Sequence, residues 1–168
     1  FIAEPIGPLA ANLRMVARLP TATPSSFGYF HSPALAARLR AELAAAGDDL
    51  VFVHCSSVAP YVAHHQGAVK VLDYGDMDSE KWAMYATERP FPLSTGYWLE
   101  SVKLRRVERE LARRFDLCTC TTLAELETLQ QLGTARRSGW FPNGVDTDFF
   151  SPADAPYDPD LVCFAGRM

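Results

Sequence analysis

The sequence has no apolar run long enough to cross a membrane and no excess of positive charge. Spanning a bilayer takes about 18 or more consecutive apolar residues, and no such stretch occurs. The N-terminus lies in no recognisable signal peptide, so we expect a cytoplasmic protein. The 16 Lys and Arg residues are outnumbered by 20 Asp and Glu residues, which gives a net charge of −4. This balance argues against nucleic acid as a partner, because binding to phosphates depends on a positive field.

Cysteine is scarce, and its spacing matches no disulfide or zinc framework. Cys118 and Cys120 would share one strand face, whereas Cys55 and Cys163 lie far away in sequence, so we predict free thiols in a reducing compartment. A metal site would need several ligands at spacings that a fold can bring together. The histidines that invite such an interpretation have no cysteine or carboxylate at a suitable spacing: His54, His64 and His65. We therefore predict no metal site.

Short apolar runs alternate with helical patterns along the 168 residues, of which 48% are hydrophobic and 21% charged. Strand patterns occupy residues 1–6, 49–55, 68–76, 116–122, 138–142 and 160–166. Helical patterns occupy residues 9–19, 32–47, 58–65, 78–88, 96–115 and 123–133. Alternating strands and helices favour parallel pairing with right-handed crossovers. The predicted fold is therefore an α/β fold, a doubly wound parallel sheet flanked by helices.

Polar residues follow several of the expected strands, and in open parallel sheets ligands bind beyond the carboxyl ends of the strands. Asp73 and Asp76 follow one strand, and their carboxylates could hold hydroxyl groups or act as a base, which makes them candidate catalytic and acceptor-binding residues. Ser56 and Ser57 follow the preceding strand and are further acceptor-binding candidates. Helix capping is the structural alternative for neighbouring residues: Asp78 and Ser79 before one helix, and Thr122 with Glu125 before another.

Positive charges cluster in the long helix expected over residues 96–115: Lys103, Arg105, Arg106, Arg109, Arg113 and Arg114. With Tyr97 and Trp98 as interfacial anchors, they could make peripheral contact with anionic lipid head groups. Three glutamates interrupt the run, which favours a solvated helix with i,i+4 ion pairs: Glu100, Glu108 and Glu110. The apolar side of this helix is expected to face the sheet: Leu104, Val107, Leu111 and Phe115.

The segment PNGVDTDFFSP at residues 142–152, followed by VCFAGRM at 162–168, closely resembles the interdomain segment of glycosyltransferase family 4. In that family a strand ends in Pro-Asn-Gly-Val-Asp, an aromatic-rich turn follows, and a Phe-x-Gly-Arg strand opens the second Rossmann-like domain of a GT-B fold. Three other stretches, GYFHSPALAARL, VLDYGDMDSEKW and RVERELARRFD, are similar to sugar transferases of exopolysaccharide and exosortase-associated gene clusters. The resemblance thus covers nearly the whole chain.

The resemblance implies an amino-terminal, acceptor-side Rossmann-like domain over residues 1–142, a hinge over 143–158, and the first strand of a donor-binding domain over 159–168. It further implies that the first strand and its glycine-rich loop precede residue 1 and that most of the donor pocket follows residue 168, so we expect this chain alone to be inactive. Arg167 matches the family arginine that meets the donor diphosphate. Many members carry a His-Asp pair where Gly75 precedes Asp76 here.

The same resemblance suggests how the chain between the two domains is built. The predicted hinge residues are Pro142, Asn143, Gly144, Asp146, Phe149 and Phe150. The Asn-Gly pair would permit positive φ in a sharp reversal, and Asp146 and Asp148 would accept hydrogen bonds from backbone N–H groups. The two phenylalanines are expected to be buried at the domain junction and to fix the hinge, whereas the alternative is an ordinary turn with a local aromatic plug.

Together with the resemblance, the sequence predicts a retaining glycosyltransferase. It would move a sugar from a nucleotide-sugar donor to a polysaccharide-related, lipid-linked acceptor by front-face displacement, without a protein-bound metal, at the inner face of the membrane. Two alternatives stay open. One is a GT-B sugar-nucleotide epimerase, which should present a histidine and carboxylate set to a bound uridine nucleotide. The other is a non-catalytic domain that binds a polysaccharide or a partner protein.

Overall fold

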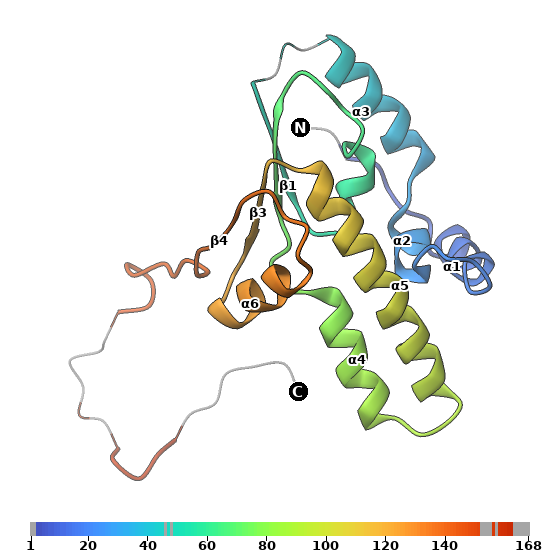
Figure 1. Cartoon of the computed structure of the whole chain (residues 1–168). Coiled ribbons are helices and arrows are strands. Elements are labelled where there is room, and N and C mark those ends of the chain that lie inside the picture. The colour runs from blue at the N-terminus through green and yellow to red at the C-terminus, as the bar shows by residue number, and fades with distance from the viewer. Residues whose placement is uncertain (1–2, 46, 48, 152–155, 157, 163–168) are drawn as a thin grey trace.

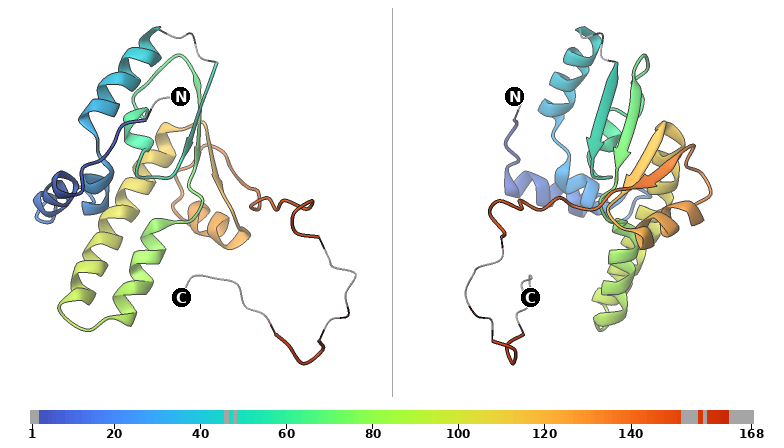
Figure 2. Two further views of the ribbon diagram at one scale, coloured as in Figure 1. Left: turned by 180° about the vertical axis from the view of Figure 1, so that it is seen from behind. Right: turned by 90° about the vertical axis from the view of Figure 1, so that its left-hand side faces the viewer.

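Four parallel strands form one sheet in the computed structural model, which describes residues 3–45, 47, 49–151, 156 and 158–162. The strands are β1 (Leu50–His54), β2 (Val69–Asp73), β3 (Leu117–Cys120) and β4 (Ser138–Trp140). They lie in the order β1-β2-β3-β4 (Figure 1), side by side in the right-hand view of Figure 2. The predicted parallel α/β sheet is confirmed, although the strand order does not reverse among these four strands, as a doubly wound sheet requires.

Helices connect and precede the strands, close to where their sequence patterns place them. They are α1 (Pro8–Ala17), α2 (Ser25–Phe30), α3 (Pro33–Ala45), the 3₁₀ turn η1 (Ala59–Tyr61), α4 (Asp78–Glu88), α5 (Leu93–Arg114) and α6 (Leu123–Gln131). Ser32 caps α3, because its hydroxyl accepts a hydrogen bond from the Leu35 N–H at 3.2 Å. The short α2 has no counterpart in the sequence prediction. No helix in the described part of the chain is both long and apolar enough to cross a membrane.

The strands predicted at the two ends of the chain differ from the structure. Residues 3–6 pair with no described strand, because Pro5 lacks an N–H to donate to a ladder and Pro8 already begins α1. Residues 160–162 form a turn and an irregular segment rather than a strand. The remaining residues of that expected strand, 163–166, and Arg167 lie outside the described residues.

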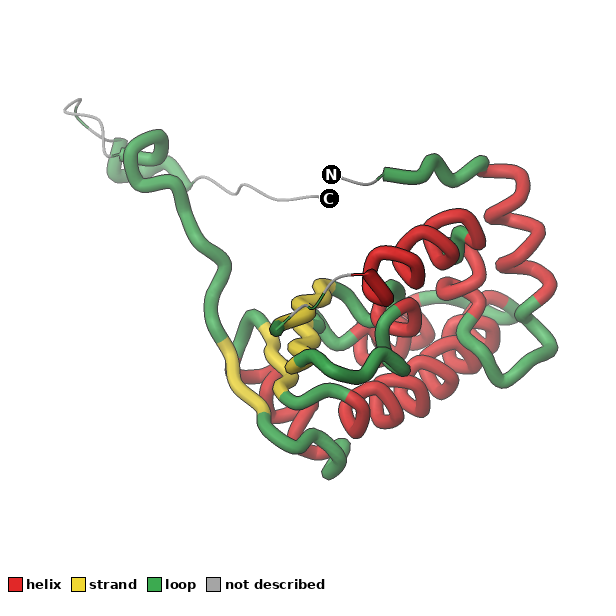
Figure 3. The backbone as a smooth tube through the Cα atoms, turned by 90° about the horizontal axis from the view of Figure 1, so that it is seen from above, coloured by secondary structure: helices red, strands yellow, loops and turns green. Residues whose placement is uncertain are grey.

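The core lies on one side of the sheet, between the strands and the connecting helices. Right-handed crossovers in an unreversed strand order place every connection on the same face, and Figures 1 and 3 show the helices gathered there. The strand residues of this face are buried: Val53, Leu72, Cys118 and Cys120. The opposite face is open, and its apolar side chains Leu50, Phe52 and Val69 are each more than half exposed. Cys55, Cys118 and Cys120 are free thiols as predicted, and Cys163 lies outside the described residues.

Helix α5 packs its apolar side on the sheet as expected, with Leu104, Leu111 and Phe115 buried and Val107 partly so. The prediction of a fully solvated polar side is wrong at two positions, because Glu100 and Glu108 are also buried. Only Glu110 forms the expected i,i+4 ion pair, with Arg114 at 2.6 Å. Tyr97 packs edge-on against Trp82, whereas Trp98 is exposed.

The two buried glutamates of α5 accept hydrogen bonds from the amino ends of other helices. Glu100 receives the N–H groups of Ser25 and Ser26 at 2.9 and 2.8 Å, at the start of α2. Glu108 receives the N–H of Ser79 at 2.9 Å, at the start of α4. The first N–H groups of a helix have no partner within the helix, so these carboxylates supply the missing acceptors from across the core. They thereby tie α2 and α4 to α5.

Two substitutions of Glu108 distinguish the effect of its charge on stability from the effect of its hydrogen bond. Burial raises the pKa of Glu108 despite the Ser79 hydrogen bond, so folding favours the protonated side chain. The stability that Glu108 contributes is therefore present below the ordinary carboxyl pKa and is lost as the pH rises through the folded-state pKa. Glu108→Gln keeps an acceptor without the charge and should gain stability relative to the wild type between about pH 5 and pH 8. Glu108→Ala leaves the Ser79 N–H unpaired and should lower the free energy of unfolding by about 1–3 kcal/mol. Urea unfolding at both pH values measures this, and equal losses in the two variants would contradict the assignment.

Candidate active-site crevice

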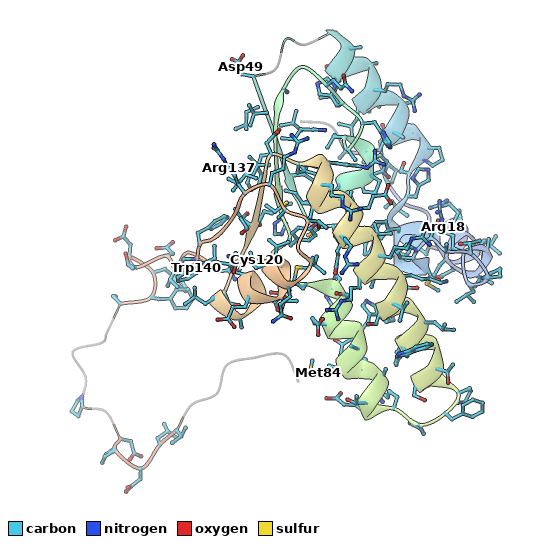
Figure 4. The ribbon with its side chains drawn as sticks, in the orientation of Figure 1. Arg18, Asp49, Met84, Cys120, Arg137 and Trp140 are labelled. Carbon is cyan, nitrogen blue, oxygen red and sulfur yellow. The ribbon has the colours of Figure 1, made fainter. Side chains whose placement is uncertain are left out.

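A small crevice of about 250 Å³ opens at the carboxyl ends of the strands. In Figure 4 the labelled residues Cys120 and Trp140 mark the ends of β3 and β4 at this edge. The crevice is lined by His54, Cys55, Tyr74, Gly75, Asp76, Asp78, Lys81, Thr121 and Asn143. These residues come from the loops that follow three strands and from the first turns of α4, with Asn143 arriving from the segment after β4. The crevice therefore lies where open parallel sheets bind ligands.

A histidine and an aspartate are paired at this edge. Parallel register places His54 opposite Asp73 and Asp73 opposite Thr119. His54 Nδ1 lies 2.7 Å from Asp73 Oδ2, and the Thr119 hydroxyl donates to Asp73 Oδ1 at 2.8 Å. The Asp73 side chain is only 5% exposed, whereas that of His54 is 61% exposed. Because a carboxylate can only accept, Nδ1 carries the hydrogen of this bond, and in the neutral form of the ring Nε2 has a lone pair for a ligand.

Hydrogen bonds to Glu108 and Glu125 hold the loop between β2 and α4 in place. The Tyr74 hydroxyl donates to the main-chain oxygen of Glu108 at 2.8 Å, and the carboxylate of the same glutamate accepts from the Ser79 N–H. The Met77 N–H donates to Glu125 Oε2 at 2.8 Å. Both ends and the middle of the loop are thus anchored by buried or half-buried groups. This anchoring holds the carboxylates of the loop in place at the crevice.

Helix capping accounts for less than the sequence indicated. The side chain of Thr122 accepts from the Glu125 N–H at 3.2 Å, as the capping box predicts, but the Glu125 carboxylate bonds to Met77 instead of closing the box. Asp78 does not cap α4: the N-cap position is Met77, which makes no side-chain cap hydrogen bond, and the Ser79 N–H donates to Glu108 of α5. Asp78 instead accepts from the Ser56 hydroxyl at 3.0 Å and from Lys81 Nζ at 2.6 Å. Neighbouring elements have taken over the capping that local residues were expected to provide.

The crevice is mixed in charge. Burial alone would lower the pKa of Lys81, but its hydrogen bond and ion pair with Asp78 outweigh burial and raise the pKa, which keeps the ammonium charged. Burial and the charges of Asp78 and Asp73 raise the pKa of Cys55, so this residue stays a thiol rather than a thiolate nucleophile. Cys55 also has φ of 77°, an unusual backbone conformation for a residue other than glycine. The turn after β1 is therefore strained beside the crevice.

The predicted site residues occupy different places. Asp76 is exposed in the crevice, where its nearest hydrogen-bond partner is the Thr121 hydroxyl at 3.4 Å. Asp73 lies behind His54 at 3% exposure. Ser56 is 1% exposed, and its hydroxyl donates a hydrogen bond to Asp78, so it does not face a ligand in the crevice. Ser57 lines a different cavity, between α3 and η1. Gly75 has φ of 68°, and a Cβ there would stand 3.4 Å from His54 Cε1.

From the sequence, His54 was a candidate only for metal binding, and its pairing with Asp73 was not predicted. The available signal was positional, since each residue closes a predicted strand and adjacent parallel strands bring such residues together. Within the described part of the chain, no group of three or more His, Cys, Asp or Glu side chains could hold a metal ion.

The predicted hinge residues leave the sheet after β4 and extend away from it (Figure 3). Asp146 caps a turn as expected, because its Oδ1 accepts from the N–H groups of Asp148 and Phe149 at 3.1 and 3.0 Å. The expected positive φ is wrong for both Asn143 and Gly144, and the reversal lies at the Asp146 turn instead. Phe149 and its neighbour pack edge to face with ring centroids 4.9 Å apart. Both rings are otherwise exposed, at 77% and 69%.

The chain was compared with known protein families, curated proteins and solved structures. The model of Glycosyltransferase Family 4 matches residues 2–149, nearly the whole chain. No curated protein and no solved structure matches it significantly. The matched segment contains both the sheet and the complete lining of the crevice.

Replacement of Asp73 by asparagine should change which ring nitrogen of His54 carries the hydrogen. In Asp73→Asn the amide oxygen can keep the Thr119 hydrogen bond, which turns the NH₂ group toward His54 Nδ1 and moves the ring hydrogen to Nε2. Long-range ¹H–¹⁵N NMR of the imidazole should show Nδ1–H in the wild type and Nε2–H in the variant. Thr119→Val, which removes a donor to the other carboxylate oxygen, should keep Nδ1–H. An unchanged tautomer in Asp73→Asn would refute the pairing.

Proposed function

This chain belongs to Glycosyltransferase Family 4, and we propose that it forms the acceptor side of a retaining glycosyltransferase. The observation that carries the proposal is the crevice, where the exposed Asp76 carboxylate and the oriented His54 imidazole stand together at the carboxyl edge of the sheet. Its volume of about 250 Å³ is below the range of about 300–1,000 Å³ typical of larger ligand pockets. It therefore suits one sugar-sized group rather than a whole nucleotide-sugar.

The chemistry proposed for this crevice is the orientation of one acceptor hydroxyl. The Asp76 carboxylate would accept a charge-assisted hydrogen bond from that hydroxyl, and His54 Nε2 would accept one from a neighbouring hydroxyl of the same sugar. In front-face displacement the acceptor oxygen bonds to the anomeric carbon while the bond to the donor phosphate oxygen breaks. The acceptor proton passes to the leaving diphosphate. The protein residues here would position and polarise, without forming a covalent bond.

His54 also supports the proposal through its position. In the family the sequence resembles, many members carry a histidine where this chain has Gly75, and the imidazole of His54 lies beside the space that a side chain at 75 would enter. We propose that His54 takes over that place from the neighbouring strand. The glycine then serves two purposes, since it adopts φ of 68° and leaves room for the ring.

The remaining features of the proposal follow from the resemblance. The donor would be a nucleotide-sugar that supplies a hexosyl group, the acceptor would be polysaccharide-related and lipid-linked, and Arg167 would meet the donor diphosphate. Transfer would need no protein-bound metal and would occur at the inner face of the membrane, with peripheral contact. The donor site would belong mainly to a second domain, with Asp146 and the Phe149–Phe150 pair in the hinge before it.

A sugar-nucleotide epimerase is the second candidate, because a histidine and two carboxylates line the crevice. The two functions differ in what they consume. An epimerase converts a nucleotide-sugar into the isomeric nucleotide-sugar without an acceptor, whereas a transferase forms a glycosylated acceptor and a nucleoside diphosphate. Product analysis with and without acceptor separates them.

Asp76→Asn should impair transfer far more than folding in the enzyme that includes the donor-binding domain. Loss of a charge-assisted contact to the reacting hydroxyl should cost about 2–4 kcal/mol in the transition state, or about 30- to 1,000-fold in kcat/KM for the acceptor. Donor hydrolysis without acceptor should change much less. Glu127→Gln, at an exposed position of α6, is the matched control and should keep normal transfer. Normal transfer by Asp76→Asn would remove this residue from the site.

The 168-residue chain should bind no nucleotide-sugar with useful affinity, because the proposal assigns most of the donor contacts to a second domain. Calorimetry with uridine, guanosine and adenosine diphosphate sugars tests this. Micromolar binding of any of them would contradict the assignment of this chain to the acceptor side.

A further inference from the structure

A second and larger cavity lies on the other side of the strained turn that follows β1. This cationic groove, about 730 Å³ in volume, runs between α3 and η1. It is lined by Arg18, Thr23, Phe27, His31, Ala36, Arg40, Leu43, Ala44, Ser57, Pro60, Tyr61, His64, His65 and Gln66. Ser57 belongs to the groove, whereas Cys55, two residues earlier, belongs to the crevice. Neither the crevice nor the proposed transfer uses any residue of the groove.

The lining of the groove is positive without any compensating charge. It contains two arginines and three histidines but no aspartate or glutamate. Among the residues that the structure describes, neither Arg18 nor Arg40 forms an ion pair. Arg38, on the same helix as Arg40, is instead paired with Glu4 outside the groove. Two arginines that line the same cavity, with no carboxylate in the lining, are suited to bind an anion.

Arg18 is held in place by its surroundings. It ends α1, where Figure 4 labels it beside α2. Its Cδ lies so close to Gly28 that a Cβ on that residue would stand 2.8 Å away. Lys103 Nζ donates to the main-chain oxygens of Arg18 and Leu19 at 3.2 and 2.8 Å, which fixes this end of α1 to α5. The main chain at Arg18 and the first part of its side chain are therefore held at the edge of the groove.

An ordered aromatic wall forms another side of the groove. The ring of His31 stacks on Tyr61 with centroids 5.7 Å apart and an interplanar angle of 10°. The Tyr61 hydroxyl accepts from the Ser32 N–H at 2.6 Å and donates to the Phe30 oxygen at 3.2 Å, so its ring cannot turn freely. Burial and the charges of Arg18 and Arg14 lower the pKa of His31, which agrees with a positive field in the groove. Apolar side chains complete the surface, among them Phe27, Leu43 and Pro60.

We propose that the cationic groove binds the phosphate or diphosphate group of a phosphate ester, with Arg40 and Arg18 on the anion and the organic part of the ester on the apolar wall. This inference rests on the proposed function and adds to it that the acceptor is such an ester. The ester could be a water-soluble sugar phosphate or a lipid-linked diphosphate. Both carry an anionic phosphate group. They differ in the organic part, a sugar or a lipid, that would contact Phe27 and Leu43.

Calorimetry on the protein without any donor tests the groove directly. The probes are inorganic pyrophosphate, glucose 1-phosphate, farnesyl diphosphate and farnesol. The wild type should bind pyrophosphate and at least one of the two esters, and Arg40→Ala should weaken each of these by at least about tenfold, which corresponds to about 1.4 kcal/mol. Arg38→Ala, on the same helix but outside the groove, should bind like the wild type. Tighter binding of farnesyl diphosphate than of glucose 1-phosphate assigns the lipid source, and the reverse order assigns the soluble one.

Three outcomes would overturn the inference: no binding of any phosphate probe by the wild type, equal affinities in Arg40→Ala and Arg38→Ala, or farnesol binding as tightly as farnesyl diphosphate. Arg40 is exposed on α3, so its removal should leave folding intact, and an unchanged thermal midpoint verifies this. The measurement does not involve transfer. Binding as expected in an enzyme that transfers no sugar would refute the proposed function alone, and transfer without binding would refute the groove alone.

Discussion

The arrangement of the crevice depends on one buried residue, Glu108 of α5. Its carboxylate accepts the Ser79 N–H and its main-chain oxygen accepts the Tyr74 hydroxyl, so a single position fixes both ends of the loop that carries Asp76. A buried charge is costly unless hydrogen bonds compensate for its lost hydration. Here one carboxylate oxygen accepts from a helix end that needs an acceptor, but burial still raises the pKa of Glu108, so this hydrogen bond compensates only in part. The position of the candidate site is therefore set by contacts within the core.

The elements with strong local patterns could be predicted from the sequence. Helix α4 has the predicted bounds, and β1, β2 and β3 lie within one to three residues of theirs. A buried parallel strand leaves a short apolar run in the sequence, and an amphipathic helix leaves a periodic pattern. Asp76 could be placed at the crevice by the rule that ligands bind at the carboxyl ends of parallel strands. Register then brought His54 to Asp73, a pairing that becomes visible only when two strands are considered together.

What the sequence could not predict depends on contacts between distant residues. Glu100 and Glu108 have the same spacing and composition as a solvated helix face, and only the helix ends opposite them explain their burial. The cationic groove likewise combines Arg18, which follows α1, with residues of α2, α3 and η1 whose closeness no local pattern reveals. The extended segment at residues 3–6 resembled a strand in composition, but strand formation also requires a neighbour with free backbone groups.

The turn that contains Cys55, Ser56 and Ser57 lies between the crevice and the groove. Ser56 is bonded to Asp78 on one side and Ser57 faces the groove on the other, and the backbone at Cys55 is already strained. If a ligand in the groove shifted this turn, the shape of the crevice and its affinity for its own ligand would change as well. Thermodynamic reciprocity then requires the crevice ligand to change the affinity of the groove by the same factor. Two cavities separated by so thin a wall can act as one cooperative unit, in which the anchoring of one part of a molecule prepares the reception of another.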